Sequence, residues 1–289
     1  MSPDALPLPR LKLHGLAGPT GDDARRLLTH AAHVDGRGVE QVWAEVCSAA
    51  GLSTGAYLLT VEEAEALAEA MVLQPGAVGV AGRDFRVRVH TYRLLAAEEA
   101  GADPAQRPYD AGFASAAQLV RSRMPDDRRL AAIAELALFS EASRTLLDQA
   151  ARRATEQLGG QIGLVTLLTA GAQSFVGDHG LEGWAAEAGG TPVEWAFCAT
   201  TVRRREAYVV PDARTDVHQR SNPLTGPIVS YAGVPLITAD GHALGALCVL
   251  GDAPAEPGPE QLEALAAVAA ETVGRLEAAR VPRVRTSAA

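Results

Sequence analysis

Lysine is almost absent from this chain of 289 residues: Lys12 stands alone, and arginine supplies the rest of the 26 basic residues. Together with abundant alanine and glycine, this bias indicates a G+C-rich coding sequence, of the kind found in actinobacteria, and it carries no information on mechanism. Acidic residues outnumber basic ones, and the formal net charge is -9. Such a charge argues against non-specific binding of the whole chain to nucleic acid or to an anionic membrane.

Cysteine is also scarce, and its placement excludes two kinds of site. Cys47, Cys198 and Cys248 lie far apart, each among apolar neighbours, and no CxxC pair occurs. This pattern is typical of reduced thiols in a cytosolic core rather than of a disulfide framework. Neither His179 nor His242 has a partner at metal-ligand spacing, so we expect no metal site.

Long apolar runs are missing as well. No run reaches the roughly 20 residues that a membrane-spanning helix needs. The early segment LPLPRLKLHGL is too short and too broken by proline for a signal peptide. We therefore expect a cytoplasmic protein without a membrane partner. Its length and its 47% hydrophobic and 21% charged residues are typical of a globular chain with two domains.

The first part of the chain contains three amphipathic helical patterns and then a valine-rich segment. Helices are expected at 22–34, 38–50 and 61–73, the last with a capping box formed by Thr60 and Glu63. Beyond Pro75-Gly76, two runs rich in valine flank a glycine. In the second run apolar residues alternate strictly with basic ones, which predicts a β-hairpin. The apolar members are Phe85, Val87 and Val89, and the basic members are Arg86, Arg88 and His90.

Three helices followed by a hairpin have the order of a winged helix, which raises a DNA-binding alternative. Against it, residues 1–125 hold 12 basic and 15 acidic residues, and the third helix carries glutamates that would repel phosphate. Nucleic acid is therefore an unfavoured partner. We expect residues 21–104 to form a small, mainly helical domain with a hairpin, whose favoured role is docking to a protein partner. A tail at 1–20 precedes it, and a proline-bearing linker at 105–125 follows.

The second part of the chain, 126–281, alternates helices and strands and ends in a short tail at 282–289. Its order of elements predicts an α+β fold, in which helices pack on an antiparallel sheet. Helices are expected at 127–139, 142–158, around WAFCATTVRR and at 258–280, and strands in IGLVTLLTA, AQSFVGDHG, AYVVPDAR and the hairpin 230–252. Both strands of that hairpin are apolar on both faces, which predicts central strands covered on each side. Gly233 and Gly245 leave room for a ligand or a helix beside the sheet.

The phrases YVVPDAR, NPL, YAGVPL and GHALGALCVL, in this order, resemble those of a GAF domain, a sensor module that binds small molecules. The resemblance covers roughly residues 126–281. It implies a six-stranded antiparallel sheet with a pocket on one face and helices on the other, where relatives commonly form dimers. The apolar stripe of the last helix and those of the helices at 127–158 also predict a homodimer.

The pocket is expected near the phrases that carry the resemblance, where apolar and polar groups are mixed as in small-molecule sites. Some of its candidates also suit structural roles: Asp212 follows Pro211 as a natural turn former, His218 suits a solvated loop, and Cys198 suits a core. The candidate ligand-binding residues are Phe197, Cys198, Tyr208, Asp212, His218, Asn222 and Tyr231. They identify no ligand or cofactor, and the signature residues of cyclic-nucleotide and bilin sites are absent.

Cys198 raises an enzymatic alternative, because some GAF relatives reduce free methionine sulfoxide with cysteines around this pocket. Such chemistry needs an activated thiolate and a second thiol that resolves the sulfenic acid. The relatives carry a cysteine in the loop before SYAGVPL, and the corresponding loop here has none. We therefore expect a sensory, ligand-binding protein without turnover. The alternatives are a DNA-binding regulator with a GAF sensor and a reductase of the free methionine sulfoxide type.

Overall fold

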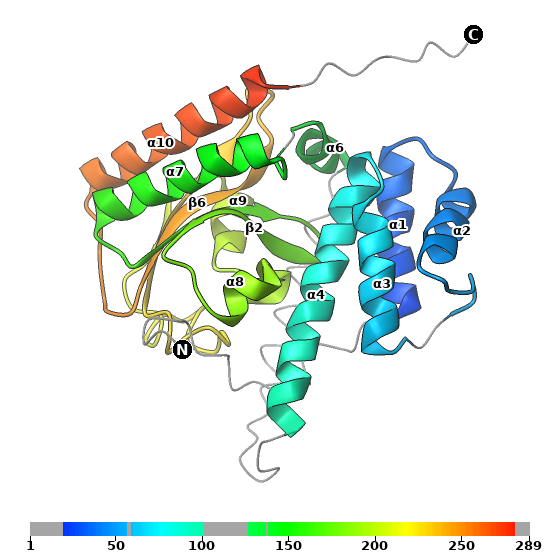
Figure 1. Cartoon of the computed structure of the whole chain (residues 1–289). Coiled ribbons are helices and arrows are strands. Elements are labelled where there is room, and N and C mark those ends of the chain that lie inside the picture. The colour runs from blue at the N-terminus through cyan, green and yellow to red at the C-terminus, as the bar shows by residue number, and fades with distance from the viewer. Residues whose placement is uncertain (1–19, 57–58, 101–126, 137, 281–289) are drawn as a thin grey trace.

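The computed structural model describes residues 20–56, 59–100, 127–136 and 138–280 (Figure 1). The expected linker 105–125, the tail 282–289, and all of the tail 1–20 except Thr20 lie outside these residues. Among the described residues, no helix combines the length and the hydrophobicity that crossing a membrane requires.

The first three predicted helices are confirmed almost to the residue. They are α1 (Gly21–Val34), α2 (Val39–Ala49) and α3 (Val61–Val72). At the start of α3, the Glu63 backbone N–H donates to Thr60 Oγ1 at 3.2 Å and the Thr60 N–H donates to Glu63 Oε2 at 2.8 Å. This reciprocal capping box fixes the first turn, as the sequence predicts.

The predicted β-hairpin is wrong, because the valine-rich segment forms one long helix, α4 (Gly76–Ala100). The helix is covered on opposite sides by different neighbours: Phe85 and Val89 belong to the core of the helical region, whereas Val87 approaches Gly190 at the edge of the sheet. A helix buried on both sides shows no 3.6-residue polarity. Because residues of its two apolar sides occupy alternate positions in this part of the sequence, they imitate the alternation of a strand.

Two features at the start of α4 explain why the chain continues as a helix after Pro75-Gly76. Asp35, in the turn after α1, accepts hydrogen bonds from the Ala77 and Val78 N–H groups at 2.9 and 3.1 Å. A carboxylate satisfies these unpaired donors and favours the helix N-terminus. At Gly82, which suggests a turn, a side chain would overlap the backbone of Met71 in α3. This glycine therefore serves close helix packing.

The basic face expected on the hairpin is distributed around α4, where carboxylates oppose it. Arg86 pairs with Glu69 at 3.3 Å, and the Nε2 atom of His90 lies 4.0 Å from Glu65. Arg88 points the other way, toward the sheet. The winged-helix alternative thus loses the hairpin on which it depends.

The second part of the chain forms an antiparallel sheet of six strands in the order β3-β2-β1-β6-β5-β4, as predicted. The strands are β1 (Ile162–Leu168), β2 (Ala172–His179), β3 (Gly190–Pro192), β4 (Tyr208–Val210), β5 (Ser230–Ile237) and β6 (Ala243–Gly251). The hairpin β5–β6 is central, and every residue of β6 except Gly251 is buried. At Gly245 a side chain would overlap the Thr166 carbonyl oxygen, so this glycine admits the neighbouring strand rather than a ligand.

Helices cover both faces of the sheet. On one face α7 (Glu141–Leu158) and α10 (Pro259–Ala278) lie side by side, and α6 (Asp127–Glu135) lies near the junction with the helical region (Figure 1). On the other face lie three short elements: α8 (Trp184–Ala188), the 3-10 helix η3 (Val193–Trp195) and α9 (Cys198–Arg204). Each face has its own apolar core.

The apolar stripe of α10 is buried within one chain. Leu265, Val268 and Val273 join the core beneath α10 and α7, together with Ile133 of α6 and Leu147 of α7. The homodimer stays a prediction, and it no longer has the support of an exposed apolar stripe.

Candidate ligand-binding cavity

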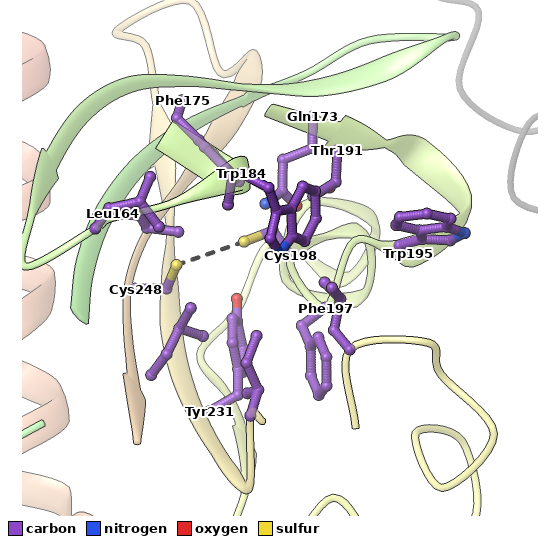
Figure 2. Close-up of a pocket in the computed structure, with 15 residues that line it drawn as sticks. Leu164, Gln173, Phe175, Trp184, Thr191, Trp195, Phe197, Cys198, Tyr231 and Cys248 are labelled. Atoms are coloured by element: carbon purple, nitrogen blue, oxygen red, sulfur yellow. Dashed lines mark hydrogen bonds between the residues drawn. The ribbon is translucent and has the colours of Figure 1, made fainter. Parts of the chain in front are cut away.

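A cavity lies between the sheet and its cover of short helices, on the face opposite α7 and α10 (Figure 2). Its floor comes from β1, β2, β3, β5 and β6. Its cover comes from α8, the segment 195–198 and the loop before β5, which contributes Leu224 and Ile228. The cover is irregular, because this face carries short helices and turns instead of long helices.

Aromatic rings make up much of the wall. The rings of Trp184 and Trp195 meet edge to face with centroids 6.4 Å apart, and Phe197 stacks on Tyr231 at 5.6 Å. The ring of Tyr208 packs against that of Tyr231 with centroids 5.9 Å apart. Tyr231 lines the cavity, and Tyr208 does not. Aromatic walls bury a large apolar area at little loss of side-chain entropy.

Three polar atoms in this apolar lining have no hydrogen-bond partner within the described part of the chain. They are Gln173 Oε1 on β2, Thr191 Oγ1 on β3 and Trp184 Nε1 on α8. Their residues are 5%, 2% and 8% exposed. Figure 2 shows Gln173 and Thr191 next to each other beside Trp184. A buried polar group without a partner costs about 1–3 kcal/mol, so such a group at a cavity marks a place for a ligand or a water.

The free space is small. The cavity volume is about 20 Å³, which suffices for a water or a molecule of similar size. A larger ligand requires the cover to move. The α8 segment lies between Gly183 and Gly189, which adopt φ of 69° and 65°, a left-handed region that glycine enters without strain.

Two thiols face each other in the cavity, one from its cover and one from its floor. The sulfur of Cys198, the first residue of α9, lies 3.6 Å from that of Cys248 in β6 (Figure 2). Burial raises the pKa of the Cys198 thiol, but hydrogen bonds with Cys248, Thr166 and Tyr231 outweigh it and lower the pKa overall. For Cys248, the hydrogen bond with Cys198 and burial both raise the pKa of the thiol. The pair is therefore asymmetric, with Cys198 the better holder of negative charge.

No group of three or more His, Cys, Asp or Glu side chains in the described residues could hold a metal ion. Nor does any charged side chain line the cavity within these residues.

The family model of the GAF domain matches residues 143–275, which include the six strands, the cavity and helix α10 up to Arg275. Residues 143–275 are a GAF domain. The GAF domain is a sensory and ligand-binding domain, and the helical region before it has no match to a family model.

One curated relative extends the match beyond the GAF domain. A cyclic di-GMP phosphodiesterase of Pseudomonas aeruginosa is 31% identical over 168 residues, which cover 56% of this chain and 27% of that protein. The chain thus spans about a quarter of the length of its curated relative. This similarity supports a signalling role for the GAF domain, but it does not identify the signal or the output.

Solved structures similar to this GAF domain share little sequence with it. A type II free methionine-R-sulfoxide reductase of Thermoplasma acidophilum is 15% identical with a TM-score of 0.41, and covers 49% of this chain and 96% of its own. The GAF-B domain of DevS from Mycobacterium smegmatis is 22% identical with a TM-score of 0.37, and covers 47% and 93%. With TM-scores below 0.5, these likenesses say nothing about the ligand.

The structure brings three of the seven predicted site residues to the cavity: Phe197, Cys198 and Tyr231. Asn222 lies beside it, with a structural role. Its Nδ2 donates to the Trp195 carbonyl at 3.1 Å, which ties the loop before β5 to the cover of the GAF domain. Ligand binding by any of these residues stays a prediction.

The other predicted polar residues lie away from the cavity. Asp212 accepts hydrogen bonds from the Arg214 side chain at 2.8 and 2.7 Å, which lower the pKa of its carboxyl group. His218 is exposed, and its backbone N–H donates to Asp216 Oδ1 at 2.8 Å. Both therefore occupy the structural roles that the sequence leaves open, as a turn former and as a solvated loop residue.

The cavity residues that sequence reasoning misses include Trp184, Gln173, Thr191 and Cys248. Trp184 lies in GLEGWAAEAGG, whose glycines could have indicated a hinged segment. Gln173 and Thr191 are opposite each other in the β2–β3 pairing, and only the register brings them together. The apolar neighbours of Cys248 indicate a core residue; it is in the core, and it also faces the cavity.

Proposed function

We propose that this protein is a cytoplasmic sensor whose GAF domain binds a small uncharged molecule in the cavity beneath α8, without turning it over. The observation that carries the proposal is the set of three buried, unpartnered polar atoms, Gln173 Oε1, Thr191 Oγ1 and Trp184 Nε1. A ligand that pairs with them would remove the cost of leaving them unpaired. The aromatic walls would supply most of the affinity.

The chemistry of these atoms narrows the ligand class. The indole N–H of Trp184 only donates, the amide oxygen of Gln173 only accepts, and the Thr191 hydroxyl can do either. A ligand with a donor and an acceptor close together, such as a primary amide or an alcohol, satisfies all three. An anion would enter an apolar site without a counter-charge, at a high desolvation cost. Cyclic dinucleotides are therefore poor candidates for this cavity.

The cavity is connected to the helical region through α8 and α4. Arg93 of α4 pairs with Glu187 of α8 at 2.8 Å, and Tyr92 and Leu94 pack against the core on the cavity face. An outward movement of α8 to admit a ligand would displace these contacts. We propose that the ligand signal reaches the N-terminal helices along α4, which makes that region the output or the docking site for a protein partner.

The experiment compares benzamide, benzyl alcohol and benzoate as probes, with thermal unfolding of the full chain followed by fluorimetry. Benzamide and benzoate have nearly the same shape and differ in charge, so only the neutral probes should raise the melting temperature. Thr191→Val keeps the side-chain shape and removes one hydrogen-bonding group, whereas Trp184→Phe removes the indole N–H together with part of the ring. Each should weaken benzamide binding about 5- to 30-fold, the effect of one lost hydrogen bond of about 1–2 kcal/mol.

Thr145→Val is the matched control, since Thr145 is exposed on α7 on the opposite face of the sheet. It should leave benzamide binding unchanged. Equal stabilisation by benzoate, or equal binding by the Thr191→Val variant and the wild type, would contradict the proposal. Native mass spectrometry of the purified protein would identify a natural ligand as a non-covalent adduct, which the Thr191→Val variant should lose.

Two further measurements separate this function from its alternatives. An NADPH- and thioredoxin-coupled assay with free methionine sulfoxide should show no turnover above that of the Cys198→Ser variant. Robust turnover by the wild type would establish an enzyme instead. Hydrogen exchange with and without benzamide should change in α8 and in the C-terminal half of α4; a change confined to α8 would refute transmission through α4.

A further inference from the structure

The cavity contains a feature that ligand binding does not use: two thiols in direct contact. Cys198 comes from the cover of the cavity and Cys248 from the sheet, and their sulfur atoms are 3.6 Å apart. Formation of a disulfide bond requires the sulfurs to approach to about 2.05 Å. Closure therefore requires the two side chains to rotate or α9 to move toward β6. The third cysteine, Cys47, lies in the core of the helical region.

The surroundings of the pair favour reaction at one of the two sulfurs. Hydrogen bonds with Thr166 and Tyr231 support negative charge on Cys198, in addition to that with Cys248. The Tyr231 hydroxyl is itself held by Thr201 at 2.7 Å. Thiolate is the reactive form of cysteine, so Cys198 is the expected nucleophile and Cys248 the resolving thiol.

The cavity also provides the space for a small oxidant. Both sulfurs belong to residues that line it, and its free volume of about 20 Å³ admits a molecule of about the size of water. Hydrogen peroxide is a neutral molecule only slightly larger than water, and it both donates and accepts hydrogen bonds. The unpartnered atoms of Gln173, Thr191 and Trp184 lie in the same cavity.

We propose that Cys198 and Cys248 form a redox-sensitive pair, which hydrogen peroxide converts to a disulfide within the GAF domain. The inference goes beyond ligand sensing and does not depend on it. The disulfide would tie α9 in the cover to β6 in the floor. Oxidation would thus be a second input to the same cavity.

The reaction balances in two steps. The Cys198 sulfur attacks one oxygen of hydrogen peroxide, the O–O bond breaks, and the other oxygen leaves as water with the thiol proton. This step gives Cys198 sulfenic acid. The Cys248 sulfur then attacks the Cys198 sulfur, the S–O bond breaks, and the hydroxyl leaves as water with the proton of Cys248. A cellular dithiol reverses the result by thiol–disulfide exchange.

The test exposes the reduced full chain to hydrogen peroxide and blocks the remaining thiols with N-ethylmaleimide in denaturant. Peptide mass mapping should recover a Cys198–Cys248 linked peptide that dithiothreitol removes, with Cys47 blocked as a free thiol. The Cys47→Ala variant should give the same linkage. In the Cys248→Ala variant, Cys198 should accumulate as sulfenic acid and be trapped by dimedone. In the Cys198→Ala variant, Cys248 should remain reduced.

Two outcomes would overturn the proposal. One is that both thiols remain free after exposure to peroxide. The other is that the linkage forms only through unfolding, so that its rate rises with low concentrations of urea and Cys47 exchanges into it. The assay reads the covalent state of the thiols, so it tests the redox pair whether or not benzamide binds.

Discussion

Asp84 is an acid enclosed where α4 meets the sheet. It is 3% exposed, and it faces Gly171 in the turn between β1 and β2. Burial raises the pKa of its carboxyl group to about 7, while hydrogen bonds from Thr169 and Gly171 and the charges of Arg129 and Arg88 only partly oppose this rise. Around neutral pH the Asp84 carboxyl, at the contact between the two regions, therefore changes between its protonated and its charged form.

This titration predicts a pH dependence of stability. The folded-state pKa of Asp84 is above the unfolded value of 3.8, so its favourable contribution is complete below that value and is lost as pH rises to about 7. The loss is on the order of a few kcal/mol. Asp84→Asn should flatten this decline, so urea unfolding at pH 5 and pH 8 should differ less for the variant than for the wild type. An identical decline in both proteins would assign the pH dependence to other groups.

Gly245 gives a second prediction at the scale of one residue. Gly245→Ala places a methyl group against the Thr166 carbonyl oxygen in the middle of the sheet. The variant should lose about 2–3 kcal/mol of unfolding free energy, as overpacked cores do. Gly274→Ala, on the exposed side of α10 with open space around it, is the matched control, and it should gain roughly 0.5–1 kcal/mol. Chemical denaturation measures both, and a mild effect at Gly245 would disprove the close strand approach.

How much of the site the sequence predicts depends on where each side chain gets its neighbours. Phe197 and Tyr231 belong to phrases with a recognisable pattern, and they line the cavity. Thr191 and Gln173 meet through the pairing of β2 with β3, which no local pattern specifies. Asp212 is a candidate because it is polar and near the right phrase, but its hydrogen bonds to Arg214 keep it in a turn. Residue type locates the region, and tertiary contacts decide which side chains face the cavity.

At the scale of elements, whether the sequence predicts a helix correctly depends on how many of its sides are buried. Helices α1 and α3 have one buried face and a capping box, so both periodicity and ends are readable. The hairpin β5–β6 has a tight turn at Gly241 and apolar strands of the right length. Helix α4 resembles a hairpin in sequence because two apolar regions enclose it, which removes the helical polarity pattern on which prediction relies.

The ion pair between Arg88 and Glu194 gives a prediction for how α4 is held. Arg88 donates to Glu194 at 3.1 Å and to the Gly171 carbonyl at 3.0 Å, and the Glu194 side chain is 1% exposed. Arg88→Met leaves a buried carboxylate without this partner, so it should cost about 3–5 kcal/mol of unfolding free energy. Adding Glu194→Gln should recover part of that loss. Arg86→Ala, at the exposed pair with Glu69, should cost at most about 1 kcal/mol.

A loss of similar size for Arg86→Ala and Arg88→Met would contradict this account, because it would mean that enclosure does not distinguish the two arginines. Urea denaturation of Arg86→Ala, Arg88→Met, Glu194→Gln and the double variant Arg88→Met with Glu194→Gln provides the comparison. The coupling energy from the double-mutant cycle isolates the pair from the packing of the Arg88 stem.

The whole molecule depends on α4, since this helix contributes to all three large cores. Val80 packs into the core beneath α7 and α10, Phe85 and Val89 into the core of the helical region, and Tyr92 against the core at the cavity. Figure 1 shows α4 between helices α1–α3 and the sheet. The expected division into a helical domain and a GAF domain, with its boundary at 105–125, stays a prediction. Described residues on the two sides of this boundary nevertheless pack into the same apolar cores.

Shared cores predict that the helical region and the GAF domain unfold together. Tryptophan fluorescence can follow each region alone, because Trp43 lies in the helical core and Trp184 and Trp195 lie at the cavity. Trp43→Phe leaves only the probes of the GAF domain, and Trp184→Phe with Trp195→Phe leaves only that of the helices. In each variant, the fluorescence midpoint in urea should coincide with the midpoint from far-ultraviolet circular dichroism, which reports both regions. Separate midpoints would show that α4 is a contact between independent domains, and they would also weaken the proposed transmission of a ligand signal along it.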